Sequence, residues 1–323
     1  AAEAGEFTRR AFVNVRIDLA EAEGLGDLLA AETELQRSTA ILSAKGAVSS
    51  QVTQWRERLL ALSALVEAAL DFSDEDDVTE LPEGFTWNIR ELSESLARWL
   101  DRPRSEKLGE GFRVALAGPP NTGKSTLFNA LVESEAAITS EIAGTTRDAL
   151  ERNVAIDGVP FSFIDTAGLR EDSDDKIERI GIERARLAFS NSDLVLWLGD
   201  EGEGPQGAWE IAARADAQDF LAKANARFTV SAHTDKGIGE LKAALVAAAR
   251  EALPKAGEAA LNERQHQRLS EAHAALASIL DMSDLLLIAE ELRTARLSFD
   301  RLIGKTTTED MLDALFGRFC IGK

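Results

Sequence analysis

Apolar residues recur every three or four positions along the first third of the chain. One apolar stripe is formed by Val48, Val52, Trp55, Leu59, Leu62 and Val66. A second, shorter stripe is formed by Ile89, Leu92, Leu96 and Trp99. This spacing places the side chains on one face of a helix. The pattern therefore predicts two amphipathic helices, separated by an acidic, turn-rich connector that contains Pro82 and Gly84.

At Arg113 the helical spacing gives way to short apolar runs. The runs RVALAG, FSFIDTAG and DLVLWLGD each have the character of a strand, and helical patterns lie between them. Strands that alternate with helices predict a parallel sheet covered on both faces. The alternation ends near Pro254, and residues 262–316 return to a helical pattern with apolar positions such as Leu285, Ile288, Leu292 and Leu302.

Helical segments on both sides of one α/β block predict a domain insertion, which is tolerated when the inserted unit has neighbouring termini. We expect residues 45–107 and 255–323 to form one all-α helical domain. Residues 108–254 would form an inserted α/β domain of the P-loop GTPase (Ras-like) class. Residues 1–44 would lead into the first long helix.

Composition narrows the function further. The 323 residues include one cysteine and three histidines, and the histidines lack metal-ligand spacing. A disulfide framework, a zinc site and a histidine triad are therefore not expected. No apolar run approaches the roughly 18 residues that span a membrane, and the first ten residues lack the basic, apolar and cleavage regions of a signal peptide. These features favour the cytoplasm and argue against a membrane partner.

The net charge of −20 bears on nucleic-acid binding. Lys and Arg supply most of the affinity for phosphate backbones, so an acidic protein is a poor non-specific binder. If the protein acts on nucleic acid, we expect a more basic partner to hold most of it. The alternative is that the acidity only keeps the protein in solution.

The segment GPPNTGKS, residues 118–125, fits the phosphate-binding pattern G-x-x-x-x-G-K-[ST] and follows a strand. Its glycines allow backbone N–H groups to surround phosphate oxygens, Lys124 reaches the terminal phosphates, and Ser125 ligates magnesium. A helix that begins near Lys124 adds its positive dipole end. The nucleotide contacts expected here are Asn121, Thr122, Gly123, Lys124, Ser125 and Thr126.

Two further motifs follow at the spacing of a GTPase. DTAG places Asp165 at the end of an apolar strand, where it would hold magnesium through water, and Gly168 would contact the γ-phosphate. GTTRD lies between this motif and the phosphate loop, where a nucleotide-sensing switch belongs. Thr146 is the candidate for the second protein ligand of magnesium.

Base recognition departs from the usual GTPase pattern N-K-x-D. The best-placed equivalent is ARAD, in which Asp216 is kept while Ala213 and Arg214 replace Asn and Lys. Asp216 would pair with the guanine donors, and the stem of Arg214 can stack over the base. Ser231 and Ala232, in SAHTDKG, would offer backbone groups to the guanine carbonyl. The replacement of Asn predicts a weakened guanine preference.

The group that activates water also differs. Ras-like enzymes use a glutamine directly after D-x-x-G, whereas Leu169 stands there in this chain. Hydrolysis must use another group, and the following acidic stretch offers several carboxylates. Asn121, inside the phosphate loop, could ligate a monovalent cation that takes the place of an arginine finger.

These motifs and both ends of the chain resemble the MnmE (TrmE) family of bacterial tRNA-modification GTPases. The shared stretches are GEFTRRAF, GPPNTGKS, GTTRDAL, DTAGLR, IERIGIERA, NERQH and FCIGK. The first and the last are the most specific, since other P-loop GTPases lack them. The resemblance covers essentially the whole chain, with residues 1–44 as the remnant of an α+β folate-binding N-terminal domain that is mostly missing.

The resemblance implies a potassium-dependent GTPase that is activated when two G domains pair in a homodimer. It implies modification of the tRNA wobble uridine by an aminomethyl-type group, together with the flavoprotein MnmG and a tetrahydrofolate derivative. Ser125 and Thr146 would hold magnesium, and Glu178 would act on the water through an intermediary. The potassium ligands would be Asn121, Ser140, Ile142 and Thr145, and the folate contacts Glu6, Lys45 and Lys323.

Three points stay open. Cys320, in FCIGK, either takes part in chemistry near the folate pocket or simply packs. The second is an alternative function of the whole chain, a ribosome-assembly GTPase of the Era or Der type, although that class should carry a basic RNA-binding appendage and no FCIGK. The third is another alternative function, a scaffold protein whose degenerate G domain binds nucleotide poorly.

Overall fold

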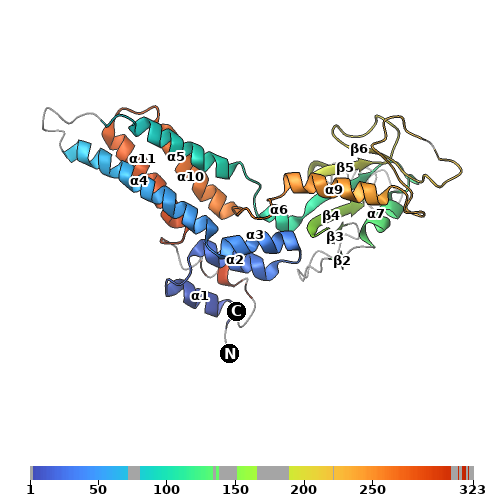
Figure 1. The fold of residues 1–323 in the computed structure, drawn as a ribbon, viewed down its shortest axis with the longest axis horizontal. Coiled ribbons are helices and arrows are strands. Elements are labelled where there is room, and N and C mark those ends of the chain that lie inside the picture. The colour runs from blue at the N-terminus through green and yellow to red at the C-terminus, as the bar shows by residue number, and fades with distance from the viewer. Residues whose placement is uncertain are drawn as a thin grey trace, which may run out of the picture. The chain divides into compact units, whose positions relative to one another are not determined.

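The chain was analysed as a computed structural model. It describes residues 3–71, 81–133, 136–137, 151–165, 189–220, 222–306, 312, 315–317 and 319, with the side chains of 136–137 left out. Contacts divide the chain into two compact units (Figure 1). The first comprises residues 1–31, 37–106 and 256–323, and the second comprises residues 32–36 and 107–255. None of the described helices is long and apolar enough to cross a membrane.

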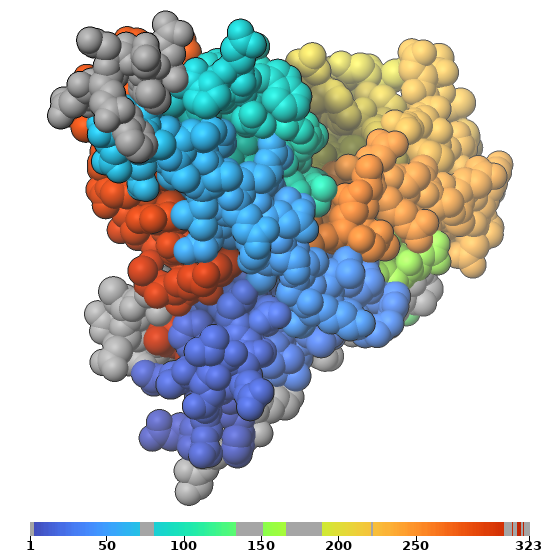
Figure 2. All heavy atoms as spheres, turned by 60° about the vertical axis from the view of Figure 1, so that its left-hand side comes forward, coloured from blue at the N-terminus to red at the C-terminus, as the bar shows by residue number. Residues whose placement is uncertain are grey.

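The first unit is helical in its described part. Its elements are α1 (Glu6–Val13), α2 (Leu19–Ala30), most of α3 (Glu34–Ala44), α4 (Ala47–Asp71), α5 (Phe85–Leu100), α10 (Glu263–Ile279) and α11 (Leu285–Leu302). The helices α4, α5, α10 and α11 lie side by side as a bundle (Figure 1). Figure 2 shows α4 and α5 together on one face of this unit. Segments on both sides of the α/β block thus share one core.

Trp55 lies at the centre of the bundle and is 1% exposed. Its ring meets Trp99 edge-on at 5.6 Å and stacks with Phe299 at 6.1 Å between centroids. Its Nε1 donates a hydrogen bond to Ser95 Oγ at 3.0 Å. A buried indole needs such a partner for its N–H group. The packing joins α4, α5 and α11 through one side chain.

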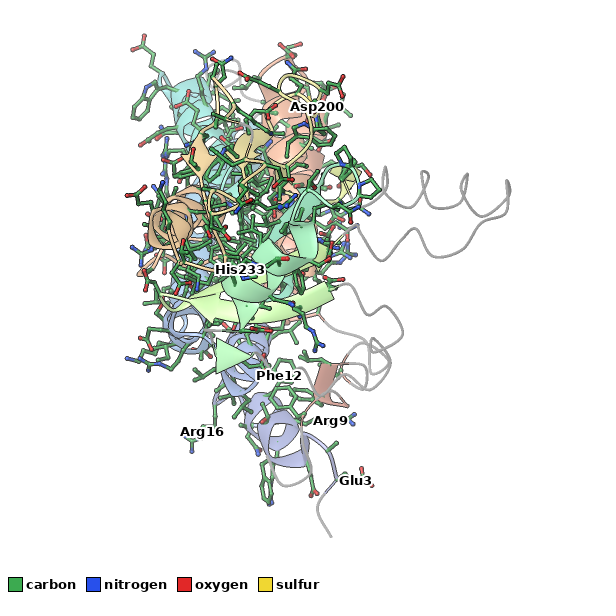
Figure 3. The ribbon with its side chains drawn as sticks, turned by 90° about the vertical axis from the view of Figure 1, so that its right-hand side faces the viewer. Glu3, Arg9, Phe12, Arg16, Asp200 and His233 are labelled. Atoms are coloured by element: carbon green, nitrogen blue, oxygen red, sulfur yellow. The ribbon has the colours of Figure 1, made fainter. Side chains whose placement is uncertain are left out.

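The short N-terminal helices pack on a small core of their own, formed by Leu19, Ala22, Leu312, Phe316 and Phe319. The ring of Phe12 on α1 lies 6.1 Å from that of Phe316 (Figure 3). A reciprocal capping box between Asp18 and Glu21 starts α2. The carboxylate of Glu23 then accepts hydrogen bonds from Arg264 at 2.6 and 2.8 Å, which fastens α2 to the start of α10.

The second unit is built on a seven-stranded sheet with the order β2-β3-β4-β1-β5-β6-β7. The strands are β1 (Phe112–Ala117), β2 (Ala136–Ala137), β3 (Glu151–Ile156), β4 (Val159–Asp165), β5 (Leu194–Trp197), β6 (Trp209–Ala212) and β7 (Phe228–Thr229). Its described helices are α6 (Glu106–Glu110), which begins at the border of the unit, α7 (Lys124–Val132) and α9 (Ile238–Ala252).

The sheet is mixed, so the expectation of a wholly parallel sheet was wrong. β1 runs parallel to β4 and β5, whereas β3 pairs antiparallel with β4 and β2. A two-residue turn joins β3 to β4, with φ of 49° at Asp157 and 73° at Gly158. Left-handed conformations at both central residues give the tight hairpin turn that Asp-Gly favours.

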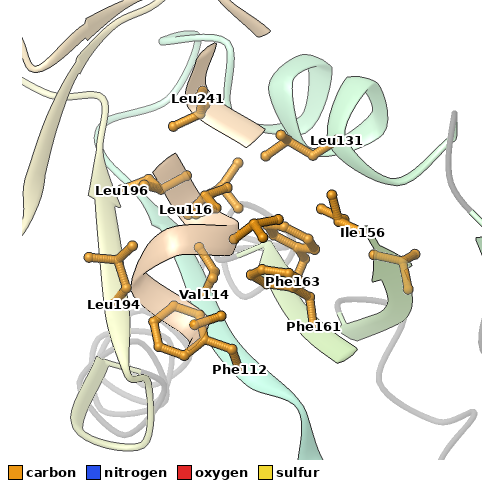
Figure 4. Close-up of a cluster of buried hydrophobic side chains, with 14 of the residues drawn as sticks. Phe112, Val114, Leu116, Leu131, Ile156, Phe161, Phe163, Leu194, Leu196 and Leu241 are labelled. Atoms are coloured by element: carbon orange, nitrogen blue, oxygen red, sulfur yellow. The ribbon is translucent and has the colours of Figure 1, made fainter. Parts of the chain in front are cut away.

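Alternate residues of β1 enter different cores, as the strand period requires. Val114 and Leu116 face the larger core, which also contains Leu131 of α7 and Leu241 of α9 (Figure 4). Ala115 and Ala117 face a smaller cluster with Ile164 and Val195. The central strand is therefore buried on both faces, and its carboxyl end is fixed firmly enough to position a site.

The predicted alternation of strand and helix fails after β5. Loops, and no helix in the described residues, connect β5 to β6 and β6 to β7. These loops are tied together by side chains: Glu201 accepts hydrogen bonds from the backbone N–H groups of Ala224 and Asn225 at 2.8 and 2.7 Å. Lys223 pairs with Glu210 of β6 at 2.8 Å. These contacts hold the two connections, residues 198–208 and residues 213–227, in place.

Candidate nucleotide site

A cavity of about 1030 Å³ lies in the second unit, where several sheet strands end. Ligands of open α/β sheets bind at the carboxyl ends of the strands, which is where this cavity opens. The largest share of the lining comes from the loop and helix after β1, residues 118–127 except Thr122. The segments after β6 and β7 add Ala213, Arg214, Asp216, Ala217, Val230, Ala232 and His233. The remaining lining residues are Phe189, Trp197 and Glu203.

The loop after β1 adopts a conformation that suits an anion. The φ angles of Gly118, Asn121 and Gly123 are 145°, 63° and 93°, all in the region that favours glycine. A Cβ at Gly118 would lie 2.8 Å from the backbone nitrogen of Gly199, so no larger residue fits. Gly123 is the N-cap of α7. The first turn of α7 therefore lies in the cavity lining, and the N-terminus of a helix favours negative charge.

Lys124 is the first residue of α7, and it is only 6% exposed. Its Nζ donates a hydrogen bond to the backbone oxygen of Pro119 at 2.6 Å. The ammonium group is thus held against the same loop whose backbone curves around the cavity. A positive charge there, next to the helix terminus, can stabilise the terminal phosphates of a nucleotide.

Ser125 and Asp165 lie forty residues apart in sequence and meet at this site. The Ser125 hydroxyl donates a hydrogen bond to Asp165 Oδ2 at 2.7 Å. Asp165 ends β4, and its position beside Leu116 of β1 in the parallel register brings it to the phosphate loop. A hydroxyl and a carboxylate are oxygen donors of the kind that magnesium prefers. The donor set therefore fits the expected ion.

At the opposite end of the cavity, Asp216 is held by Ser231. The buried Ser231 hydroxyl donates a hydrogen bond to Asp216 Oδ1 at 2.5 Å and accepts one from Thr234 N at 3.2 Å. The hydrogen bond from Ser231 is the main cause that lowers the pKa of Asp216 below its usual value. The exposed carboxylate is therefore ionised at neutral pH and can accept hydrogen bonds from a ligand's N–H groups.

Some lining residues were not singled out from the sequence. They are Phe189, Trp197 at the end of β5, Glu203 and His233. His233 directly follows Ser231 and Ala232 and is labelled in Figure 3. The charge of His233 also contributes to the lowered pKa of Asp216. Trp197 and His233 each lie at or just after a strand end, and that position was the available signal.

Several predicted site residues lie outside the described part of the chain: Ser140, Ile142, Thr145, Thr146, Gly168, Glu178 and Lys323, together with Cys320. Asn121, Lys124 and Ser125 line the cavity, and Thr122 binds the Pro119 oxygen through its hydroxyl at 3.0 Å. In the first unit, Glu6 begins α1 and accepts a hydrogen bond from Glu3 N, while Lys45 follows α3. Both side chains are exposed.

The phosphate loop between a buried strand and a helix, with Lys124 and the Ser125–Asp165 pair, defines a P-loop nucleoside triphosphatase. A family model described as the MnmE helical domain matches residues 19–320. A tRNA modification GTPase MnmE of Erythrobacter litoralis is 62% identical across the whole chain, which spans 76% of that relative. The MnmE of Novosphingobium aromaticivorans is 60% identical, also with 76% covered. This chain belongs to the MnmE family, and it is a GTP hydrolase.

The chain was also compared with solved structures, and two of the matches are a FeoB G domain and an Era protein. The FeoB G domain of Methanococcus jannaschii is 24% identical, with a TM-score of 0.30, 44% of this chain covered and 99% of that one. Aquifex aeolicus Era bound to GDP and aluminium fluoride is 23% identical, with a TM-score of 0.31, 50% of this chain covered and 66% of that one.

Proposed function

We propose that this protein hydrolyses GTP within the pathway that modifies the tRNA wobble uridine, in partnership with the flavoprotein MnmG. Family membership supports the pathway, since the relatives are named tRNA modification GTPases. The pairing of Ser125 with Asp165 beside Lys124 is the observation that carries the hydrolytic part of the proposal. The net charge of −20 supports a division of labour in which the partner holds most of the tRNA.

The nucleotide would lie across the cavity, with its phosphates on the loop after β1 and its base near Asp216. Lys124 and the N-terminal N–H groups of α7 stabilise the phosphate charge. Ser125 and Thr146 would hold magnesium directly, and Asp165 through water, with Gly168 at the γ-phosphate. Bound there, the ion neutralises charge on the β- and γ-phosphates.

Guanine recognition belongs to the loops after β6 and β7. The ionised Asp216 would accept hydrogen bonds from the two neighbouring N–H donors of guanine. Ser231 holds this carboxylate in place through its hydroxyl. Backbone groups of Ser231 and Ala232 would meet the guanine carbonyl. A base without the two donors would offer Asp216 no hydrogen bond to replace those that its carboxylate loses to water, which is costly.

Water activation would proceed without the usual glutamine, because Leu169 occupies that position. We assign the supporting carboxylate to Glu178, which would act through an intermediary. Potassium would supply the charge that an arginine finger supplies elsewhere, held by Asn121 and by loop residues of a G domain that pairs with its copy. The further potassium ligands in this proposal are Ser140, Ile142 and Thr145.

We also propose a one-carbon donor, an oligomeric state and a cellular compartment for this protein. A tetrahydrofolate derivative would contact Glu6, Lys45 and Lys323, and the protein would act as a homodimer. The names of the relatives, tRNA modification GTPases, support a site of action in the cytoplasm. The folate-domain remnant would be residues 1–44 and the G domain residues 108–254. The helical domain would combine residues 45–107 with residues 255–323.

GTP turnover in potassium chloride, compared with sodium chloride at equal ionic strength, tests the proposal. We expect faster hydrolysis in potassium. Asn121→Ala should reduce the ratio of the rate in potassium to the rate in sodium at least about tenfold, because it deletes a ligand of the ion that neutralises developing charge. Asn129→Ala, on the exposed side of α7 outside the cavity lining, is the matched control. Equal rates in the two salts, with paired G domains verified, would remove the potassium part of the account.

A further inference from the structure

Trp197 is the last residue of β5, and in the parallel register it pairs with Ala117, the last residue of β1. It lines the nucleotide cavity but belongs to none of the GTPase motifs of the sequence. We propose that Trp197 is a positioning residue for GTP hydrolysis, which holds the phosphate loop at Pro119 and thereby places the ammonium group of Lys124. This inference rests on the proposed function, because Lys124 acts on the phosphates in the same site.

The indole of Trp197 and the ring of Pro119 both lie next to the place where a side chain of Gly199 would begin. A Cβ at Gly199 would lie 2.5 Å from Cζ2 and 2.8 Å from Cε2 of Trp197, and 2.7 Å from Cδ of Pro119. These distances are too short for a carbon atom, so any side chain here would push the two rings apart. The absence of a side chain at Gly199 therefore lets the indole support the phosphate loop.

The indole is also held by the connection between β5 and β6. Its Nε1 donates a hydrogen bond to the backbone oxygen of Asp200 at 2.8 Å, and the same oxygen accepts one from Glu203 N at 3.3 Å. A Cβ at Gly204 would lie 2.7 Å from Cγ of Trp197, so the backbone passes close to the side chain there too. Residues 198–208, all of them described, contain no helix. This connection therefore packs against the phosphate loop through one large side chain.

Pro119 links the indole to the charge at the terminal phosphates. Its backbone oxygen accepts hydrogen bonds from Lys124 Nζ at 2.6 Å and from the Thr122 hydroxyl at 3.0 Å. Lys124 is only 6% exposed, so its ammonium group has little room to compensate when Pro119 moves. A displacement on the order of 1 Å can cost about a hundredfold in rate. Support of Pro119 by Trp197 is therefore also support of Lys124.

A purely structural role of Trp197 predicts a different result from this positioning role. The indole also packs against the small core that contains Ala117 and Val195, so its truncation can lower stability without any effect on Lys124. Gly199→Ala avoids this difficulty, because it leaves the indole in place and only adds a methyl group beside the two rings. The φ of Gly199 lies outside the left-handed region, so alanine brings no backbone strain.

The test is single-turnover GTP hydrolysis by the full chain in magnesium and potassium. Trp197→Phe and Gly199→Ala are each introduced into the unsubstituted protein and into Lys124→Met. In the unsubstituted protein, Gly199→Ala should lower the rate at least about tenfold, and Trp197→Phe about two- to fivefold. In Lys124→Met neither should lower the rate further, because the ammonium group whose position they change is gone. Each variant should still bind GDP.

Gly239→Ala, on α9, is the matched control, because a Cβ there meets no atom within 4 Å. It should hydrolyse GTP at the normal rate. The inference is overturned if Gly199→Ala or Trp197→Phe keeps the normal rate. It is also overturned if they lower the rate by the same factor in Lys124→Met, as a general loss of folded protein would. If Lys124→Met alone hydrolyses GTP normally, the phosphate site itself is wrong and the proposed function fails with it.

Discussion

Two carboxylates, one beside the cavity and one in its lining, are each fixed by a serine hydroxyl. Ser125 binds Asp165 at 2.7 Å at the phosphate end, and Ser231 binds Asp216 at 2.5 Å at the base end. Each pair joins residues that follow different strands, so the sheet sets the distance between the two ends. The motif spacing predicted Asp165 and Asp216, but not the hydroxyl that holds Asp216, because that contact depends on the path of the loop after β7.

Asp216→Asn should change which base the protein accepts. The substitution replaces one acceptor oxygen with an N–H donor, so it no longer matches both guanine donors but matches the extra carbonyl of xanthine. We expect at least about tenfold weaker GDP binding and a measurable gain in affinity for xanthosine diphosphate. Titration with the two diphosphates measures this. Retained GDP affinity without xanthosine binding would show that Asp216 does not read the base.

The helices of the bundle were well predicted because their apolar residues follow helical spacing. All six apolar positions predicted between residues 48 and 66 are buried in α4. The hairpin of β3 and β4 was missed, although Asp157-Gly158 was a turn signal within the sequence. The absence of a helix between β5 and β6 could be expected from the sequence, because the segment from Asp200 to Ala213 is short. The side-chain ties, such as that of Glu201 to the 224–225 backbone, could not, because they depend on tertiary structure.

Trp55→Ala should destabilise the bundle by about 3–5 kcal/mol, because it leaves a large cavity among Trp99, Phe299 and their neighbours. Trp55→Phe keeps most of the ring packing and should cost less, mainly through the lost hydrogen bond to Ser95. Urea unfolding followed by circular dichroism measures both. GDP affinity is the control and should not change, since the cavity belongs to the other unit. Equal stability of Trp55→Ala and wild type contradicts the packing described.

The molecule consists of a helical unit assembled from two separated chain segments and an α/β unit between them. The insertion was predictable because helical periodicity stops near residue 108 and returns near residue 262. One detail was not: residues 32–36 belong with the α/β unit, where Leu35 joins the large core and its N–H donates to Gly158 O at 3.1 Å. Such a long-range contact leaves no periodic signal in five residues.

Pairing of two molecules through their G domains is expected only when the phosphate site is filled. In potassium, GDP with aluminium fluoride should shift the protein to a larger species in size-exclusion chromatography with light scattering. Neither GDP alone nor the same mimic in sodium should produce this shift. The reason is that the cation would neutralise charge that develops only in the transition state. A size that is independent of nucleotide and cation contradicts activation by G-domain pairing.

The most direct measurement is single-turnover GTP hydrolysis by Lys124→Met in magnesium and potassium. The account predicts a rate at least about a hundredfold below that of the unsubstituted protein, because the buried ammonium group is the positive charge at the terminal phosphates. Lys255→Met, an exposed lysine outside the cavity lining, should hydrolyse GTP at the normal rate. Normal turnover by a folded Lys124→Met protein would contradict the assignment of this cavity as the GTP site.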